Sequence, residues 1–169
     1  MGEGRTLFWS GGTRRRGAVV LVLNSFARKA LLTFKLISSC LLRVRVEGKH
    51  GKMPVLTCYA LTNEAKDEDK DDSYAFLSSE LSSVPPHNYL IVLEDFNAGI
   101  ANSSGLYDAA NGPMAVDILN DNGKPLLNCC ITHALLVTDT WFLRRDIAMQ
   151  TWYSNDGKTK EMLDYIIIR

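Results

Sequence analysis

LIVLEDFN, residues Leu90–Asn97, is the stretch that decides the fold. The apolar run Tyr89–Leu93 predicts a strand buried on both faces. It delivers Asp95 and Asn97 just past its carboxyl end, where residues at i and i+2 of extended chain point the same way. A carboxylate there can hold a hard cation or orient a water, and an amide can donate to a phosphate oxygen. Asp-x-Asn also forms ordinary turns, so this spacing alone leaves both interpretations open.

Further strands and two helices are expected around this segment. Strands are indicated by a continuous apolar run, by apolar–polar alternation and by β-branched content, at 18–23, 32–37, 41–46 and 53–60. The charge run 64–72 is expected to be a solvated loop. Helices are expected from Ser73 to Val84 and from Asp121 or Asn122, as N-cap, to Leu136.

The chain end is expected to form a hairpin, in which 151–154 and 161–168 flank an Asn155-Asp156-Gly157 turn. Strands outnumber helices, and each helix lies between strands. We therefore expect an α/β or α+β sandwich, with residues 1–169 as a single domain.

Composition restricts the possible partners. Lys+Arg and Asp+Glu both number 19, so the formal net charge is zero and any DNA contact has to come from local basic patches. The four cysteines form no CxxC pair, which argues against a zinc site and fits a reduced intracellular protein. The longest apolar runs are too short for a bilayer, so no membrane contact is expected.

Two other stretches carry groups suited to phosphate chemistry. The strand 53–60 leads into Tyr59-Ala60-Leu61-Thr62-Asn63, which offers a phenol and a carboxamide at a strand end. Asp164 lies in the otherwise apolar run 163–168, where a buried carboxylate is costly unless it is paired. Asp164 therefore either makes a structural hydrogen bond or orients a catalytic imidazole.

Together and in this order, the three stretches resemble the magnesium-dependent endonuclease/exonuclease/phosphatase domain. That family has a strand ending in Gly-Asp-Phe-Asn, an earlier Tyr-x-Pro-(x)-Asn and a late Asp-Tyr-Ile strand. Further segments, at 10–16, 120–127, 141–146 and 150–158, are similar to the branch found in LINE retrotransposons and craniofacial development protein 2-like proteins. The resemblance runs from Gly4 to Ile168. It implies a DNase I-like sandwich of two β-sheets flanked by helices.

The resemblance also implies roles for individual residues. Asp95 resembles the acid that positions the attacking water, and Asn97 resembles its partner in binding Mg²⁺ (or Mn²⁺) and phosphate. Tyr59 resembles the active-site tyrosine, and Asp164 resembles the acid behind the catalytic histidine. The candidate DNA contacts are Arg14, Arg15, Asn63, Arg144, Arg145 and Trp152.

The chain also departs from the family pattern. The family's metal-binding glutamate precedes the segment that matches Gly4–Gly12, and its Ser-Asp-His segment follows the Asp-Tyr-Ile strand. None of His50, His87 and His133 suits the place of that histidine, and His133 is expected to pack within a helix. Glu94 and Leu61 stand where the family has Gly and Pro. We therefore expect a domain truncated at both ends, with weak Mg²⁺ binding and impaired catalysis.

Three functional hypotheses follow from these observations. The first is a DNA endonuclease of retrotransposon origin that hydrolyses phosphodiesters and is catalytically impaired. The second is a non-catalytic interaction module in a nuclear or chromatin factor, with unknown protein partners, and the third is an unselected transposon remnant. All three are expected to be intracellular, and the first two nuclear.

Overall fold

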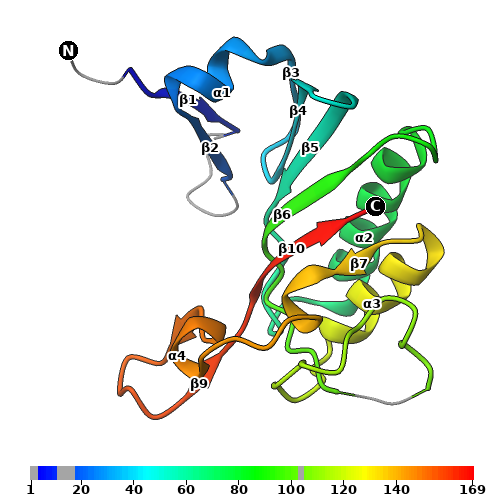
Figure 1. Cartoon of the computed structure of the whole chain (residues 1–169). Coiled ribbons are helices and arrows are strands. Elements are labelled where there is room, and N and C mark those ends of the chain that lie inside the picture. The colour runs from blue at the N-terminus through cyan, green and yellow to red at the C-terminus, as the bar shows by residue number, and fades with distance from the viewer. Residues whose placement is uncertain (1–3, 11–17, 103–104) are drawn as a thin grey trace.

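A six-stranded mixed sheet forms the centre of the computed structural model, which describes residues 4–10, 18–102 and 105–169 (Figure 1). In spatial order its strands are β3 (Leu31–Ser38), β4 (Leu41–Gly48), β5 (Gly51–Cys58), β6 (Ile91–Asp95), β10 (Asp164–Ile168) and β7 (Leu136–Val137). Strands β5 and β6 are parallel, and the other neighbouring pairs are antiparallel. The mixed sheet and its helices confirm the predicted α/β class.

The meander β3-β4-β5 follows from period-2 patterning. On β4, Leu42 and Val44 are fully buried on one face, while Arg43 and Arg45 lie on the other. Strand β6 begins at Ile91 rather than at Tyr89, which is exposed. Its burial is also one-sided: Val92 is fully buried and Leu93 is half-buried, so the expected burial on both faces is wrong.

Two helices cover one face of the sheet, α2 (Asp67–Ser82) and α3 (Gly123–Thr132) (Figure 1). Leu81 of α2 and Leu127 of α3 belong to one core cluster with Val92 of β6 and Ile167 of β10. Full burial of such a side chain stabilises a fold by about 1.5–3 kcal/mol. This layer therefore fixes β6 and β10 side by side at the centre of the sheet.

Both helix predictions need corrected boundaries. Helix α2 begins at Asp67, not after Ser73, because the acidic run supplies its first turn, where carboxylates interact favourably with the helix dipole. Helix α3 ends at Thr132, not at Leu136. Ala134 then takes a positive φ of 51° and turns the chain, and Leu136–Val137 pairs with β10 as β7.

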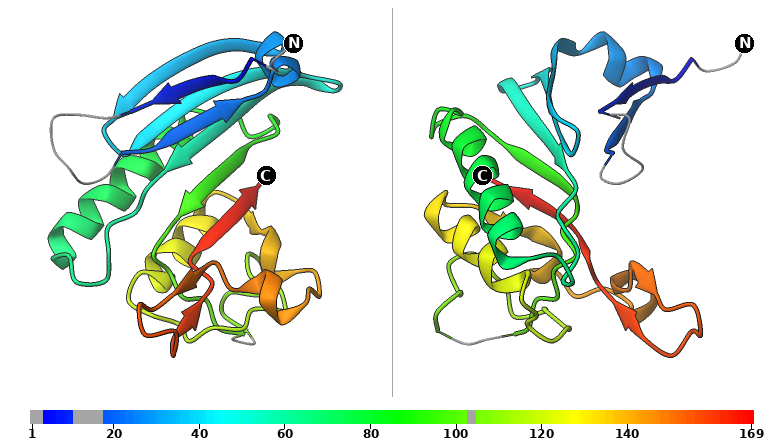
Figure 2. Two further views of the ribbon diagram at one scale, coloured as in Figure 1. Left: turned by 90° about the vertical axis from the view of Figure 1, so that its left-hand side faces the viewer. Right: turned by 180° about the vertical axis from the view of Figure 1, so that it is seen from behind.

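A small antiparallel hairpin of β1 (Thr6–Trp9) and β2 (Val20–Leu23) packs on the opposite face of the sheet (Figure 2). Val19 forms a second core cluster with residues of β4, and the rings of Phe8 and Phe34 lie 4.7 Å apart between centroids. The buried strand predicted over 18–23 is only half buried. Val20 is 45% exposed and Val22 is 51% exposed, because within the described ranges no layer covers the outer side of β2.

The remaining elements are short. They are α1 (Ser25–Lys29), the 3₁₀-helix η1 (Thr138–Thr140), α4 (Asp146–Met149), β8 (Trp152–Tyr153) and β9 (Lys160–Glu161). Strands β8 and β9 form the predicted hairpin, with Gly157 at φ 69° in its turn. Strand β10, expected in that hairpin, instead leaves it and joins the central sheet, so the hairpin with α4 projects from one end (Figure 1).

No helix in the described part of the chain has the length and apolar content needed to cross a bilayer. The adjacent cysteines of α3, Cys129 and Cys130, pack in or against the hydrophobic core. Burial raises the pKa of the Cys129 thiol to about 11, and burial also raises the pKa of Cys130. Both thiols are therefore protonated at neutral pH and serve packing.

Candidate functional site

The predicted catalytic residues come together at the carboxyl end of β6. Asp95 and Asp164 are directly opposed partners of β6 and β10, so their Cβ atoms are about 4.5–5.5 Å apart. The amide N–H of Ala60, next to Tyr59, donates to the Asp95 carbonyl at 3.0 Å. The Asn97 side chain in turn donates to the Ala60 carbonyl at 3.0 Å. Hydrogen bonds thus join the three stretches that the sequence singles out.

Two carboxylates face the same side of the sheet here. Burial raises the pKa of Asp95, the Asn97 amide that donates to its Oδ1 at 2.8 Å lowers it, and the negative charge of Asp164 raises it further. The net direction is upward, so this environment disfavours the charged form of Asp95. A bound cation would relieve both the burial cost and the repulsion.

Asn97 adopts a left-handed backbone conformation, with φ 48°, that asparagine tolerates better than most residues. Its carbonyl accepts hydrogen bonds from the side-chain amides of Asn120 and Asn122, both at 3.2 Å. Asn122 also donates to the Leu61 carbonyl at 2.7 Å and is only 1% exposed. The two asparagines thus fasten the loop after β5 to the turn after β6.

Sequence reasoning missed that role. It assigned Asn122 as a candidate helix cap, and Asn122 does occupy the position before α3, but its side chain makes no capping hydrogen bond. The cap-like bond comes instead from Asn120, whose Oδ1 accepts from the Gly123 amide at 2.8 Å. The signal was a cluster of asparagines between loop and helix, which predicts caps and buried networks equally well.

Asp164 is exposed, and the expectation of a buried acid is wrong. The alternation of β10 explains this, since Tyr165 and Ile167 point into the helical layer while Asp164 and Ile166 point to the other face. The Tyr165 hydroxyl donates to the Ala98 and Met162 carbonyls, which fixes this register. An apolar run therefore concealed a strand with one exposed side.

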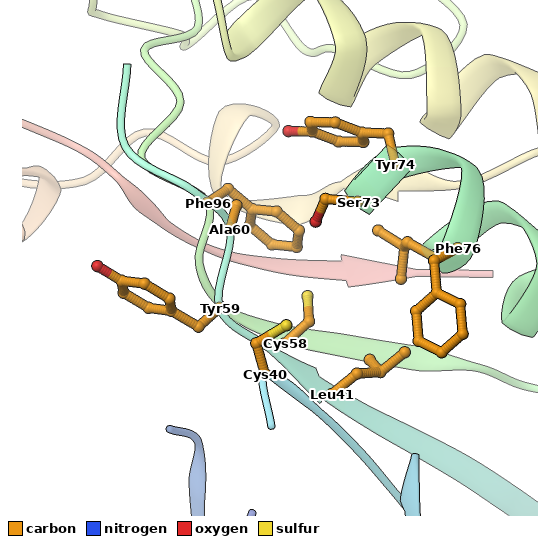
Figure 3. A pocket seen from close by; sticks show the side chains of 10 residues that line it. Cys40, Leu41, Cys58, Tyr59, Ala60, Ser73, Tyr74, Phe76 and Phe96 are labelled. Carbon is orange, nitrogen blue, oxygen red and sulfur yellow. The ribbon is translucent and has the colours of Figure 1, made fainter. Parts of the chain in front are cut away.

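Tyr59 is half-buried just beyond β5, and its amide donates to the Cys40 carbonyl at 3.0 Å. It borders a cavity of about 30 Å³ between the sheet and α2, and its hydroxyl points away from Ser73 and Tyr74 (Figure 3). That volume suits about one water molecule. The cavity is therefore a small packing defect that cannot hold a phosphate group. The Tyr59 hydroxyl points out of this cavity (Figure 3).

A larger pocket, of about 320 Å³, lies near the carboxyl end of β6, where Asn97 and Leu163 line it but Asp95 and Asp164 do not. Its lining brings together three candidate residues from separate segments, namely Asn63, Asn97 and Trp152. Trp152 is 44% exposed on β8, so its ring is available for stacking on a base. Glu64 and Glu161 also line the pocket and would repel a phosphate unless a cation intervened.

The arginines predicted to contact DNA differ in whether their side chains already have a partner in the protein. The Arg144 guanidinium donates to Oδ1 of Asp139 at 2.7 Å, and Oδ2 of the same buried carboxylate accepts from the Ile166 amide at 2.7 Å. Arg144 is therefore anchored through Asp139 to Ile166, the central residue of β10. Arg145 is exposed, and Arg14 and Arg15 lie outside the described residues.

Of the three histidines, His133 has the packing role that the sequence predicts. His133 lies at the end of α3, where its Nε2 is 2.7 Å from the Ser78 hydroxyl of α2. Burial lowers the pKa of this imidazole, and the nearby Arg169 lowers it further. His133 packs the two helices together, on the opposite face of the sheet from Asp95.

The groups at the carboxyl end of β6 suit a magnesium ion in kind but fall short in number. Carboxylate and amide oxygens are the donors that Mg²⁺ prefers. Asp95 and Asp164 supply two carboxylates, and Asn97 supplies one amide. Across the described ranges, however, no three His, Cys, Asp or Glu side chains are grouped so that they could hold a metal ion.

No protein-family model matches the chain. Two curated proteins named craniofacial development protein 2 are similar to it in sequence. The protein from Bos taurus is 28% identical over 155 residues, which cover 92% of this chain and 26% of that protein. The protein from Tragulus javanicus is 26% identical, with 92% and 27% covered. The chain thus spans about a quarter of the length of these relatives.

Two solved structures share the fold. An endonuclease/exonuclease/phosphatase family protein from Leptotrichia buccalis matches 99% of this chain and 60% of its own, with a TM-score of 0.61 and 14% identity. The endonuclease domain of TRAS1, a telomere-specific non-LTR retrotransposon, matches 96% and 66%, with a TM-score of 0.64 and 11% identity. The resemblance in the sequence motifs is therefore confirmed: the chain has the DNase I-like fold of endonuclease/exonuclease/phosphatase domains and is similar in sequence to craniofacial development protein 2.

Proposed function

We propose that this domain binds DNA at the carboxyl end of β6 as a magnesium-dependent phosphodiesterase of retrotransposon origin, and that the 169-residue chain alone is catalytically impaired. The observation that carries the proposal is the opposed pair Asp95 and Asp164, joined by hydrogen bonds to the Tyr59–Asn63 loop. The nuclease-type fold supports the proposal. A DNA substrate makes the nucleus the site of action.

The proposed roles follow from the positions of the groups. Asp95 orients a water molecule or holds a cation through water. Asn97 contributes its carboxamide to a phosphate oxygen, while Asn63 and Trp152 line the adjacent pocket and hold the flanking nucleotide. Magnesium, when bound, would supply Lewis-acid stabilisation of charge on the phosphate. Tyr59 and Asp164 border the same end of the sheet and complete the polar surroundings.

We propose impaired catalysis because the described residues bring too few metal ligands and catalytic groups together. Two carboxylates and an amide leave most of an octahedral shell to water, which supports weak metal binding. None of the three histidines, all of which the structure describes, accompanies Asp164: His133 contacts Ser78 of α2, His50 lies in the turn between β4 and β5, and His87 lies in the turn before β6. Loss of one member of a cooperating catalytic set lowers kcat by roughly 10⁴-fold or more. Glu94, where the family has glycine, adds a further departure.

The test is nicking of supercoiled plasmid with Mg²⁺ or Mn²⁺ by the purified chain, by Asp95→Asn and by a control, Asp71→Asn. Asp71 is an exposed acid of α2, away from the site. We expect no nicking above background from any of the three. If the unmodified chain and the control nick DNA while Asp95→Asn does not, the impaired reading is wrong and the nuclease assignment stands.

A non-catalytic interaction module is the second candidate, favoured by one observation. The outer face of the β1–β2 hairpin exposes Leu7, Trp9, Val20 and Val22 side by side. Contiguous exposed apolar side chains of this kind mark interaction surfaces in soluble proteins. DNA binding distinguishes this candidate from the first, because an interaction module need not bind a single-stranded oligonucleotide at the Trp152 pocket.

A further inference from the structure

A second polar pocket lies at the end of the sheet opposite the carboxylate pair. It has a volume of about 240 Å³ and is lined by Thr33, Arg43, Arg45, Pro54, Ser83 and Asn88 among others. Strand β5 leads from Pro54 at this pocket to Cys58, the residue before Tyr59 at the candidate site, a span of about 13 Å for four residue steps of extended chain. This pocket is therefore separate from the proposed nuclease site.

The sheet places two guanidinium groups on its wall. Arg43 and Arg45 are two residues apart on β4 and point to the same face, opposite the buried Leu42 and Val44. Arg45 is paired directly with Thr33 of β3 on one side and with Pro54 of β5 on the other. The arginine therefore stands in the middle of a cross-strand row, with a hydroxyl beside it.

One arginine is held by the protein and the other is not. Arg43 donates to the Ser83 hydroxyl at 2.9 Å and forms an ion pair with Glu80 at 3.3 Å, which fixes it against the end of α2. The side chains of Arg45, Thr33 and Asn88 have no hydrogen bond or ion pair to any residue that the structure describes. Three donor groups without partners thus line one pocket, and no acidic side chain lines it.

We propose that this pocket binds a phosphate group carried by a small ligand, either free phosphate or a mononucleotide. The planar fork of Arg45 matches two phosphate oxygens, and the Thr33 hydroxyl and the Asn88 amide can donate to the others. Because Glu80 neutralises Arg43, the pocket offers about one uncompensated positive charge. That charge suits a single phosphate rather than a long polyanion, whose affinity comes from many cations.

The test is calorimetric titration of the purified chain with inorganic phosphate and, separately, with deoxyadenosine monophosphate. Chemical shifts of the Arg45 side chain are followed by NMR in the same titrations. We expect saturable binding of at least one ligand, with Arg45 resonances shifting. The variant Arg45→Ala is expected to weaken the affinity by about tenfold or more, as loss of a charge-assisted bidentate contact does. Arg5→Ala, which removes an exposed arginine elsewhere, is expected to bind like the unmodified chain.

A second variant separates binding from folding. Thr33→Val removes the hydroxyl and keeps a β-branched side chain on the edge strand β3, so it should weaken binding without unfolding the chain. Tighter binding of the mononucleotide than of phosphate identifies a nucleotide ligand, and equal affinities identify the phosphate group alone. The proposal is overturned if neither ligand binds saturably, if Arg45→Ala keeps full affinity, or if only a DNA oligonucleotide binds.

Discussion

Replacing Asp95 with asparagine is expected to stabilise the fold, because the candidate site holds two carboxylates at a cost. The charge of Asp95 is disfavoured by burial and by Asp164, its direct cross-strand partner. At about 5 Å, two charges repel by roughly 0.8 kcal/mol in water and by about 3 kcal/mol at an effective dielectric constant of about 20. Asp164 is exposed, so solvent screening keeps the repulsion near the lower figure.

The variant also weakens a hydrogen bond, which reduces the expected stabilisation. The Asn97 amide now donates to a carboxylate, and in the variant it donates to a neutral amide oxygen, which weakens that bond by about 1 kcal/mol. Burial raises the pKa of Asp95 by more than the Asn97 hydrogen bond lowers it, so the charged form is destabilised overall. The folded state of the uncharged variant should therefore be more stable. The relieved repulsion and the weakened hydrogen bond nearly cancel, so the stabilisation comes from the burial cost of the charge; we expect less than about 1 kcal/mol at pH 7, or a Tm higher by less than about 2–4 °C for a domain of this size.

The pH dependence of stability follows from the same raised pKa. A folded-state pKa above the unfolded value means that the folded state binds its proton more tightly, so the unmodified chain loses stability as pH rises from about 4 through the folded pKa of Asp95. The advantage of Asp95→Asn should therefore vanish near pH 3.5 and be complete at pH 7. Thermal denaturation of both chains and of Asp71→Asn across this range measures it. A lower Tm for Asp95→Asn at pH 7, with Asp71→Asn unchanged, would refute the reasoning.

Three further outcomes are expected. Asn122→Ala removes two partly buried hydrogen bonds to the Leu61 and Asn97 carbonyls and should cost about 1–3 kcal/mol in urea denaturation, whereas a loss near zero would show that the asparagine clamp is dispensable. Asp139→Ala leaves the Ile166 amide and Arg144 without their acceptor and should cost about 2–3 kcal/mol, more than Arg144→Ala, and the reverse order would contradict the anchoring role. Calorimetry with Mg²⁺ should give only weak binding, and a sub-micromolar affinity that Asp95→Asn abolishes would disprove the two-carboxylate account.

Patterning predicted the strands of the central sheet because their alternation reflects which face is buried. The segments 32–37 and 41–46 lie within β3 and β4, and the segment 53–60 overlaps β5 but runs two residues beyond its end at Cys58. The start of α2 and the end of α3 were predicted wrongly, because local charge and capping patterns are each compatible with more than one helix boundary. The acidic run before Ser73 begins α2 rather than preceding it, and the end of α3 is set by the pairing of Leu136–Val137 with β10, a long-range contact.

The candidate site was predictable in part. Motif order indicated that Asp95, Asn97 and Asp164 meet; strand pairing opposes Asp95 and Asp164, and a hydrogen bond from the Asn97 amide to Asp95 holds the third residue beside them. Exposure of Asp164 was not predictable, because a continuous apolar run does not reveal which face a second layer covers. The asparagine clamp was equally hidden, since Asn122 reaches the Leu61 carbonyl across 61 residues of chain.

Binding of a short single-stranded DNA oligonucleotide, followed by fluorescence anisotropy, tests the central claim most directly. Trp152 lines the pocket beside Asn63 and Asn97, whereas Trp141, 40% exposed, lies outside it. Loss of base stacking costs about 1–3 kcal/mol per base, so Trp152→Ala should weaken binding by about tenfold and Trp141→Ala should leave it unchanged. The account predicts that pattern, with affinity falling as salt rises. Absence of binding, or equal effects of the two variants, would contradict it.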